Sequence, residues 1–286
     1  MTTVSPSGVF NAACVQLRAG REVAANIAQA LALMEVAADA GAQFITTPEN
    51  TSLMEAKRDL LFEKTRAEAD DEALAAFRAF AAKRRLWLLI GSLPIRLSGE
   101  KIANRSFLIG PDGTIAARYD KIHMFDVDLG GGESYRESKN FAPGSEAVLT
   151  DLPWGRLGMS VCYDLRFPHL YRALAHGGAV FLTVPSAFTR PTGEAHWHVL
   201  LRARAIESGA FVFAPAQGGL HENGRETYGH SLIVAPWGEI IAEADHAEPG
   251  IIMAEIDPVR VADARSRVPS LTHDRLFSLS NQIKQS

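Results

Sequence analysis

The order of apolar and polar positions along the chain predicts short strands that alternate with helices. Apolar runs that end at glycine or proline indicate strands, and alanine-rich runs with apolar residues three or four positions apart indicate helices. In the first half we predict strands at 9–17, 44–47 and 86–93, helices at 23–40 and 70–85, and a hairpin of 104–109 with 114–119. In the second half we predict strands at 156–162, 179–184, 211–216 and 251–256, helices at 167–176 and 194–208, and a hairpin of 229–234 with 239–243.

Two stretches of sequence occur twice in the same order. Gly41–Glu49 (GAQFITTPE) pairs with Gly178–Ser186 (GAVFLTVPS), and Ser106–Ile115 (SFLIGPDGTI) pairs with Ser231–Ile240 (SLIVAPWGEI). The alternative is that α/β proteins reuse the same strand and turn residues, but two matches in order favour an internal duplication. Two halves, each a sheet with helices on one face, bury their bare faces against each other. The predicted fold class is therefore α/β, a four-layer α-β-β-α sandwich from two duplicated halves.

Composition narrows the classes of function that are open. The 286 residues are 47% hydrophobic, enough for one large core, so we predict a single domain over 1–267 and a tail over 268–286 that packs at a subunit interface. A net charge of −4 with scattered basic residues excludes nucleic acid and membrane as expected partners. Two cysteines cannot build a disulfide framework, and no apolar run approaches the roughly 18 residues of a membrane helix. We expect a cytoplasmic protein.

Three chemically capable side chains follow predicted strands, where an α/β sheet presents its ligands. Cys162 comes at the end of one strand, but an ordinary thiol is only about 3% thiolate at pH 7 and needs activation. Glu49 follows a buried strand and Pro48, so we expect burial to raise its pKa and make it a base near neutrality. Lys121 is flanked by apolar residues, which favours a fixed positive charge. A structural cysteine, a loop glutamate and a solvated lysine remain the alternative interpretations.

Together these contexts resemble the nitrilase, or carbon–nitrogen hydrolase, superfamily, over most of the chain from about residue 9 to residue 256. The motifs that carry the resemblance are Pro48-Glu49-Asn50, Tyr119–Asp126 and Val161–Pro168. The resemblance implies the α-β-β-α sandwich, and hydrolysis of a C–N bond through a cysteine thioester. It also implies the residue roles: nucleophile Cys162, general base Glu49, oxyanion donors Lys121 and the backbone N–H of Tyr163, and a second glutamate, Glu137, for which Glu133 is a competing match.

Four further motifs, at 185–188, 192–197, 200–207 and 228–231, are most similar to the deaminated glutathione amidase branch, with the omega-amidases as near relatives. This branch implies a small amide substrate that carries carboxylates, the release of ammonia or an amine, no cofactor or metal, and a homodimer or larger homo-oligomer. The candidate substrate-binding residues are Arg166, Phe188, His196 and Trp197, in addition to Tyr163. Each could instead be structural. N-carbamoyl amine hydrolase and nitrilase activities are alternatives on the same site.

Three other interpretations compete with this one. A metallohydrolase could use His196 and His198, but residues two apart at the start of a helix point in different directions and no partner stands at ligand spacing. A cysteine enzyme could use His123 as its base, because His123 lies only two residues from Lys121. A non-catalytic binding protein could share the fold, although all three family positions are intact.

Overall fold

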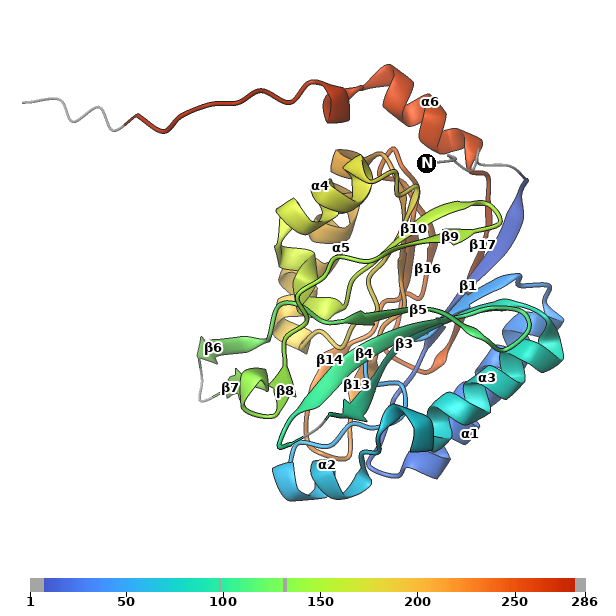
Figure 1. Ribbon diagram of the computed structural model, residues 1–286, viewed down its shortest axis with the longest axis vertical. Helices are drawn as coiled ribbons and strands as arrows, with labels where there is room; N and C mark the ends of the chain where they lie inside the picture. The colour runs from blue at the N-terminus through green and yellow to red at the C-terminus, as the bar shows by residue number, and fades with distance from the viewer. Residues whose placement is uncertain (1–7, 98, 131–132, 281–286) are drawn as a thin grey trace, which may run out of the picture.

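The computed structural model describes residues 8–97, 99–130 and 133–280 (Figure 1). Its first sheet has the strand order β17-β1-β2-β3-β4-β5, with the short β8 beside β4. The strands of this sheet are β1 (Phe10–Gln16), β2 (Phe44–Thr46), β3 (Trp87–Arg96), β4 (Ile102–Ile109), β5 (Ile115–Asp120), β8 (Phe141–Ala142) and β17 (Gly250–Ile256). β1, β2 and β3 are parallel, whereas β4 and β5 continue the sheet as antiparallel strands.

The second sheet has the order β16-β15-β12-β11-β10-β9. Its strands are β9 (Leu149–Leu152), β10 (Gly155–Met159), β11 (Phe181–Thr183), β12 (Phe211–Ala214), β15 (Leu232–Val234) and β16 (Ile240–Glu243). β10, β11 and β12 are parallel, and β15 and β16 are antiparallel, so the order and directions of the first five strands occur twice. In each sheet an extra antiparallel strand pairs with the first strand of the repeated unit: β17 pairs with β1, and β9 pairs with β10. The predicted duplication is confirmed.

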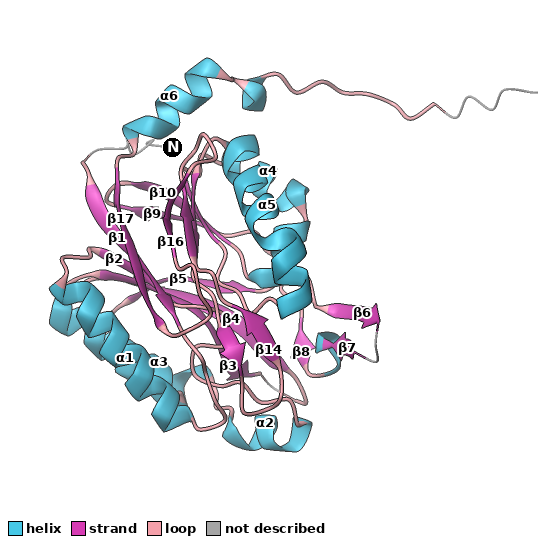
Figure 2. Cartoon of the chain, turned by 180° about the vertical axis from the view of Figure 1, so that it is seen from behind, coloured by secondary structure: helices cyan, strands magenta, loops and turns pink. Residues whose placement is uncertain are grey.

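Helices cover the outer face of each sheet (Figure 2). On the first sheet, α1 (Val23–Asp39) and α3 (Glu72–Arg84) bury apolar side chains such as Met34 and Phe77 against the strands. On the second sheet, α4 (Pro168–His176) and α5 (Arg190–Ser208) do the same with side chains that include Leu174 and Leu201. Their apolar residues recur at helical spacing, so one stripe of each helix faces its sheet.

The inner faces of the two sheets share one aromatic core. Phe10 meets Phe181 and Phe44 meets Phe213 edge to face, with ring centroids 5.5 and 5.4 Å apart. All four rings are almost fully buried. Because each sheet has an apolar inner face and an outer face covered by helices, the layers follow the order α-β-β-α, as predicted.

Two predicted elements differ from the structure. The strand at 251–256 was grouped with the second half, but β17 pairs antiparallel with β1 and extends the first sheet. The strand predicted at 156–162 ends at Met159, and Cys162 begins a short 3-10 helix, Cys162–Arg166. The prediction that Cys162 ends the strand was wrong, because its backbone has φ +51°, a left-handed conformation that a strand cannot hold.

The remaining elements are short and polar, and hydrophobic periodicity did not predict them. They are α2 (Arg58–Lys64), α6 (Val259–Arg267), the ribbon of β6 (Asp126–Gly130) with β7 (Glu133–Arg136), and the ribbon of β13 (Gly218–Leu220) with β14 (Glu226–Tyr228). In the part of the chain that the structure describes, no helix has the length and apolar character that crossing a bilayer requires.

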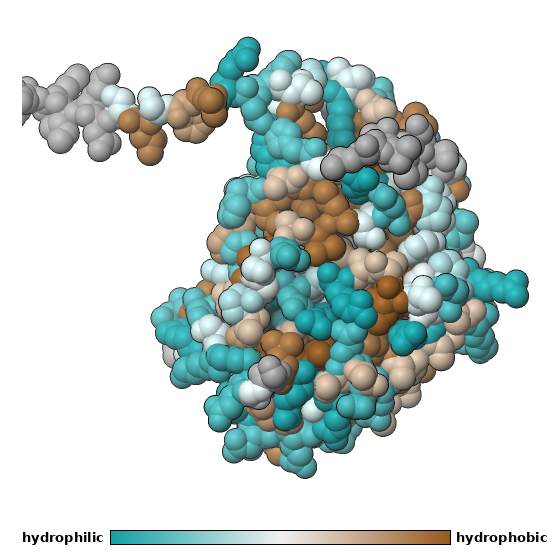
Figure 3. All heavy atoms as spheres, in the orientation of Figure 1, coloured by the Kyte–Doolittle hydropathy of each residue, from teal (hydrophilic) through white to brown (hydrophobic). Residues whose placement is uncertain are grey.

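Beyond α6 a short 3-10 helix, Ser270–Thr272, and Asp274 still contact α4, and the chain then leaves the body of the molecule. Residues up to 280 extend away from both sheets (Figure 1), and the side chains of Leu276, Phe277 and Leu279 are almost fully exposed. Figure 3 shows apolar residues on this extended segment, away from the main body. The predicted interface role of residues 268–286 stays a prediction, and residues 281–286 lie outside the described part.

Gly91 in β3 provides a test of how closely the strands approach beside Glu49. A Cβ atom at this position would lie 2.0 Å from the Thr47 carbonyl oxygen and 2.4 Å from that of Pro48. We expect Gly91→Ala to lower the free energy of unfolding by about 1–3 kcal/mol through overpacking, measured by urea denaturation. Gly250→Ala is the matched control, since its nearest atom would lie 3.9 Å away. Equal stability of the two variants would contradict the close approach.

Candidate active site

Cys162 lies in a tight turn that holds its thiol between the two sheets. Its backbone N–H donates to the Pro185 carbonyl oxygen at 2.9 Å, and its side chain is buried. Asp164, fully buried two residues later, accepts from the Val161 N–H at 2.9 Å and from the Tyr119 hydroxyl at 2.7 Å. These contacts hold Cys162 in its left-handed backbone conformation from both sides. Proteins tolerate such strain where the surrounding structure enforces it.

Glu49 follows β2 and turns its carboxylate toward the same point. One oxygen, Oε1, accepts from Lys121 Nζ and from Asn104 Nδ2, both at 2.9 Å. The other oxygen, Oε2, accepts from the Ala187 N–H at 3.0 Å. The residue is 3% exposed. A buried carboxylate with three donors has its orientation determined by the protein, not by solvent.

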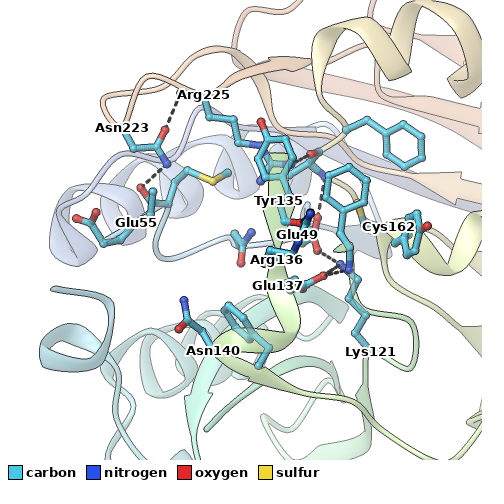
Figure 4. Close-up of a pocket in the computed structure, with 18 of the residues that line it drawn as sticks. Glu49, Glu55, Lys121, Tyr135, Arg136, Glu137, Asn140, Cys162, Asn223 and Arg225 are labelled. Atoms are coloured by element: carbon cyan, nitrogen blue, oxygen red, sulfur yellow. Dashed lines mark hydrogen bonds and ion pairs between the residues drawn. The ribbon is translucent and has the colours of Figure 1, made fainter. Parts of the chain in front are cut away.

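Lys121 follows β5, and its ammonium group lies between two carboxylates. Nζ contacts Glu49 Oε1 at 2.9 Å and the two oxygens of Glu137 at 2.8 and 3.0 Å. Glu137 is held in turn by the Phe125 N–H at 2.7 Å and by Asn104 Nδ2 at 3.1 Å. Figure 4 shows both carboxylates turned toward the lysine, with Cys162 beside them. The structure thus brings Glu49, Lys121, Glu137 and Cys162 together.

The electrostatics of these groups determine the charges they carry in the free protein. Burial by itself raises the pKa of Glu49, but the Lys121 charge and a hydrogen bond from the Cys162 thiol outweigh it, so the pKa of Glu49 is lowered. The expected rise was wrong, because sequence reasoning counted burial without the lysine. Burial, followed by the Glu49 charge, raises the pKa of the Cys162 thiol, against the effect of Lys121. Burial by itself lowers the pKa of Lys121, but the charges of Glu137 and Glu49 outweigh it, so the pKa of Lys121 is raised. At neutral pH the site therefore contains a thiol, a carboxylate and an ammonium.

A cavity of about 530 Å³ opens onto these groups. Of the substrate-binding residues that we predicted, Tyr163, Arg166 and Phe188 line it. Among its described lining residues, neither His196 nor Trp197 occurs. Trp197 is 1% exposed and its indole N–H donates to the His230 carbonyl at 2.7 Å, so it belongs to the core behind Phe188. His196 is exposed and its Nδ1 lies 3.2 Å from Arg166 Nη1, so it contacts a pocket residue from outside.

Comparison with known proteins identifies the family. The family model described as carbon-nitrogen hydrolase matches residues 11–266. The chain belongs to the carbon–nitrogen hydrolase family. This agrees with the family predicted from the three motifs, and the chain is accordingly a hydrolase that acts on amide C–N bonds.

Two amidase relatives of this carbon–nitrogen hydrolase match it over almost their full length. It is 40% identical over 272 residues to a deaminated glutathione amidase from a Synechocystis species, covering 94% of this chain and 98% of the relative. It is 32% identical over 276 residues to the human omega-amidase NIT2, covering 96% and 99%. The crystal structure of the Caenorhabditis elegans NitFhit protein superposes with a TM-score of 0.87 at 34% identity, covering 95% of this chain and 66% of that one.

Two residues of the hydrolase site escaped sequence reasoning. Asn104 is 2% exposed in the middle of β4, and its amide bridges Glu49 and Glu137. Asn104 stands among other polar residues, Arg105 and Ser106, in β4, so the local sequence carried no distinct signal for it. Arg225 lies in the β13–β14 connection, donates to the Ala187 carbonyl and packs over the Tyr135 ring, and its charge also lowers the pKa of Glu49. Nothing in the local sequence distinguished it from a surface arginine.

The structure also separates the residues that competed for roles. His123 turns its Nδ1 to Asp164 at 2.7 Å and stacks on Phe167, and it is not among the described residues that line the cavity. Glu133 lines the cavity but accepts from the Tyr135 hydroxyl at 2.7 Å, whereas Glu137 contacts the lysine. The geometry therefore places Glu49 and not His123 beside the thiol.

Replacing Glu49 by Gln tests the charges at the site. The variant removes the negative charge that raises the pKa of the Cys162 thiol, so we expect that pKa to fall while turnover is lost. The rate at which iodoacetamide alkylates Cys162, followed across pH by mass spectrometry, measures it. Mass spectrometry distinguishes Cys162 from Cys14, which is fully buried. Glu133→Gln is the control and leaves the thiol pKa unchanged; a thiol pKa that stays the same or rises in Glu49→Gln contradicts the arrangement.

Proposed function

We propose that this chain hydrolyses a small amide that carries a carboxylate, through a thioester on Cys162, with release of ammonia or an amine. The observation that supports the proposal most directly is the convergence of three segments. Glu49 and Lys121 are 2.9 Å apart, and the Cys162 thiol hydrogen-bonds the Glu49 carboxylate at the base of the cavity. A nucleophile, a base and a fixed cation are the groups that acyl transfer from an amide requires.

In the first step the sulfur of Cys162 attacks the amide carbon while Glu49 takes the thiol proton. The pKa of the thiol is raised and that of Glu49 is lowered, so proton transfer is uphill in the free enzyme. The thiolate therefore forms as the carbon–sulfur bond forms, and not beforehand. Such a site keeps its thiol protected until a substrate is bound.

The tetrahedral oxyanion is stabilised by Lys121 Nζ and by the backbone N–H of Tyr163. In the described part of the chain, no oxygen accepts a hydrogen bond from this N–H, which leaves it free for a ligand. Glu137 keeps the lysine charged and aimed, since both of its oxygens contact Nζ. The loss of one oxyanion donor costs about 10²–10³ in rate.

Collapse of this intermediate breaks the C–N bond, and Glu49 passes its proton to the departing nitrogen. The acyl group is then a thioester on Cys162. Glu49 next takes a proton from water as its oxygen attacks the thioester carbon, and the proton returns to the sulfur when the C–S bond breaks. The products are a carboxylic acid and an amine or ammonia, and the enzyme is restored.

The substrate class rests on the relatives and on the cavity wall. A relative with 40% identity is a deaminated glutathione amidase and another is an omega-amidase. Arg136, Arg166 and Arg225 line the cavity and offer guanidinium groups to a carboxylate. N-carbamoyl amine hydrolase or nitrilase activity on the same site are the alternatives, and a non-catalytic binding protein is the alternative from another class.

We further propose that the enzyme works in the cytoplasm as a homodimer or larger homo-oligomer, with one hydrolase domain over 1–267 and an interface tail over 268–286. Both cysteines are unpaired thiols, which a reducing compartment preserves. The exposed Leu276, Phe277 and Leu279 are typical of a segment that becomes buried against another subunit. Cell fractionation tests the compartment.

An ammonia-release assay tests the activity. We expect turnover of a dicarboxylate monoamide or of deaminated glutathione, none in Cys162→Ala, and a loss of at least about 10²–10³-fold in kcat in Lys121→Met. N-carbamoyl amines and nitriles in the same assay distinguish the alternative activities. Release from no compound supports the binding-protein alternative, and a loss in His123→Ala as large as that in Cys162→Ala supports histidine as the base.

Truncation after Val268 tests the tail. We expect the mass of the full-length assembly, measured by light scattering after size exclusion, to fall in the truncated chain, because the apolar side chains that cover a partner are removed. The paired substitution Phe277→Ser and Leu279→Ser should weaken assembly in the same direction without shortening the chain. An unchanged mass in both variants contradicts the interface role.

A further inference from the structure

Outside the catalytic cavity, three side chains with metal-ligating atoms converge from separate elements. His198 lies on α5, His230 follows β14, and Glu243 ends β16. One ligand atom from each lies within 4.8 Å of the other two. None of the three is among the described residues that line the cavity. The cluster is therefore separate from the site of amide hydrolysis.

One nitrogen of this cluster has no partner. Nδ1 of His230 is buried, and no hydrogen-bonding group in the described part of the chain satisfies it. It faces Glu243 Oε1 at 3.8 Å, too far for a hydrogen bond. The same oxygen lies 2.8 Å from Nε2 of His198. A buried polar atom without a partner is rare, and a bound cation would satisfy it.

The surroundings hold His230 where it is. Its backbone has φ +55°, and its carbonyl oxygen accepts from the buried indole of Trp197 at 2.7 Å. Its ring stacks on Tyr228, with centroids 4.2 Å apart. The stacking and the backbone contact together hold the ring in this orientation.

We propose that His198, His230 and Glu243 bind one divalent transition-metal ion, with zinc as the reference case. Two imidazoles and one carboxylate form a donor set that zinc favours. Ligand atoms about 2.1 Å from a tetrahedral zinc ion lie about 3.4 Å from one another. The observed separations run from 2.8 Å to at most 4.8 Å, so modest side-chain rotations produce that spacing. The ion takes the unpaired His230 nitrogen as a ligand.

In this proposal the ion has a structural role, and water completes its coordination. His198, His230 and Glu243 have side chains 29%, 23% and 33% exposed, so solvent reaches the cluster. A bound ion ties the outer helix α5 to the strand β16 beneath it. The proposal also revises the expectation that no metal is present, and it pairs His198 with distant residues instead of with His196, which contacts Arg166.

Equilibrium dialysis of the full-length Cys162→Ala protein against zinc, with metal analysis, tests the proposal without using activity. The background substitution removes the catalytic thiol as a competing ligand. We expect one ion per chain, a rise in Tm on saturation, and a visible absorption spectrum of tetrahedral type with cobalt in place of zinc. Each of His198→Gln and His230→Asn should weaken binding by at least about 100-fold, since even the loss of a supporting contact costs 10–100-fold.

The variants are chosen to preserve the fold. Asn tolerates the left-handed backbone at His230, and Gln is favourable in the helix at His198. His273→Ala removes an exposed imidazole in the tail, outside the cluster, and should leave binding unchanged. The proposal is overturned if the parent protein binds no zinc at a saturable site, or if both ligand variants bind it as the parent does. Neither result bears on the ammonia-release assay, so the two proposals fail independently.

Discussion

The ammonium group of Lys121 lies between the carboxylates of Glu49 and Glu137 at the base of the cavity, with only 2% of the lysine side chain exposed. A buried charge is tolerated only with a close partner and full hydrogen bonding. Here one cation meets two anions, and Asn104 donates to both carboxylates. The contact keeps the lysine charged and Glu49 ionised. The chemistry at Cys162 depends on both conditions.

The fold makes this contact possible because it brings distant strand ends to one place. Glu49 follows β2, Lys121 follows β5, and Cys162 comes shortly after β10 of the other sheet. The aromatic core between the sheets holds these strand ends in fixed positions relative to one another. The duplicated halves then diverge in chemistry: where one half has Glu49 after a proline, the other has Ser186, and the Pro185 carbonyl before it accepts from Cys162.

The charges at the site explain why the thiol is kept neutral at rest. Burial and Glu49 raise the pKa of Cys162, and Lys121 lowers that of Glu49. A resting thiol reacts slowly with chance electrophiles, and in the proposed mechanism the stabilisation of the developing oxyanion by Lys121 offsets the cost of proton transfer. The proposed metal cluster lies on the outer layer, where it stabilises α5 without entering this chemistry.

The sequence by itself determined the main strands and helices, the duplication and the three catalytic candidates, because hydrophobic period, turn residues and motifs are local properties. Only the tertiary structure shows that Asn104 and Arg225 belong to the site, because the groups they contact lie far away along the chain. The direction of the pKa shift of Glu49 was also decided by the tertiary structure, because it depends on Lys121, 72 positions later in the chain. The same holds for Trp197: its residue type suits a pocket and a core equally, and only packing shows that it fills the core.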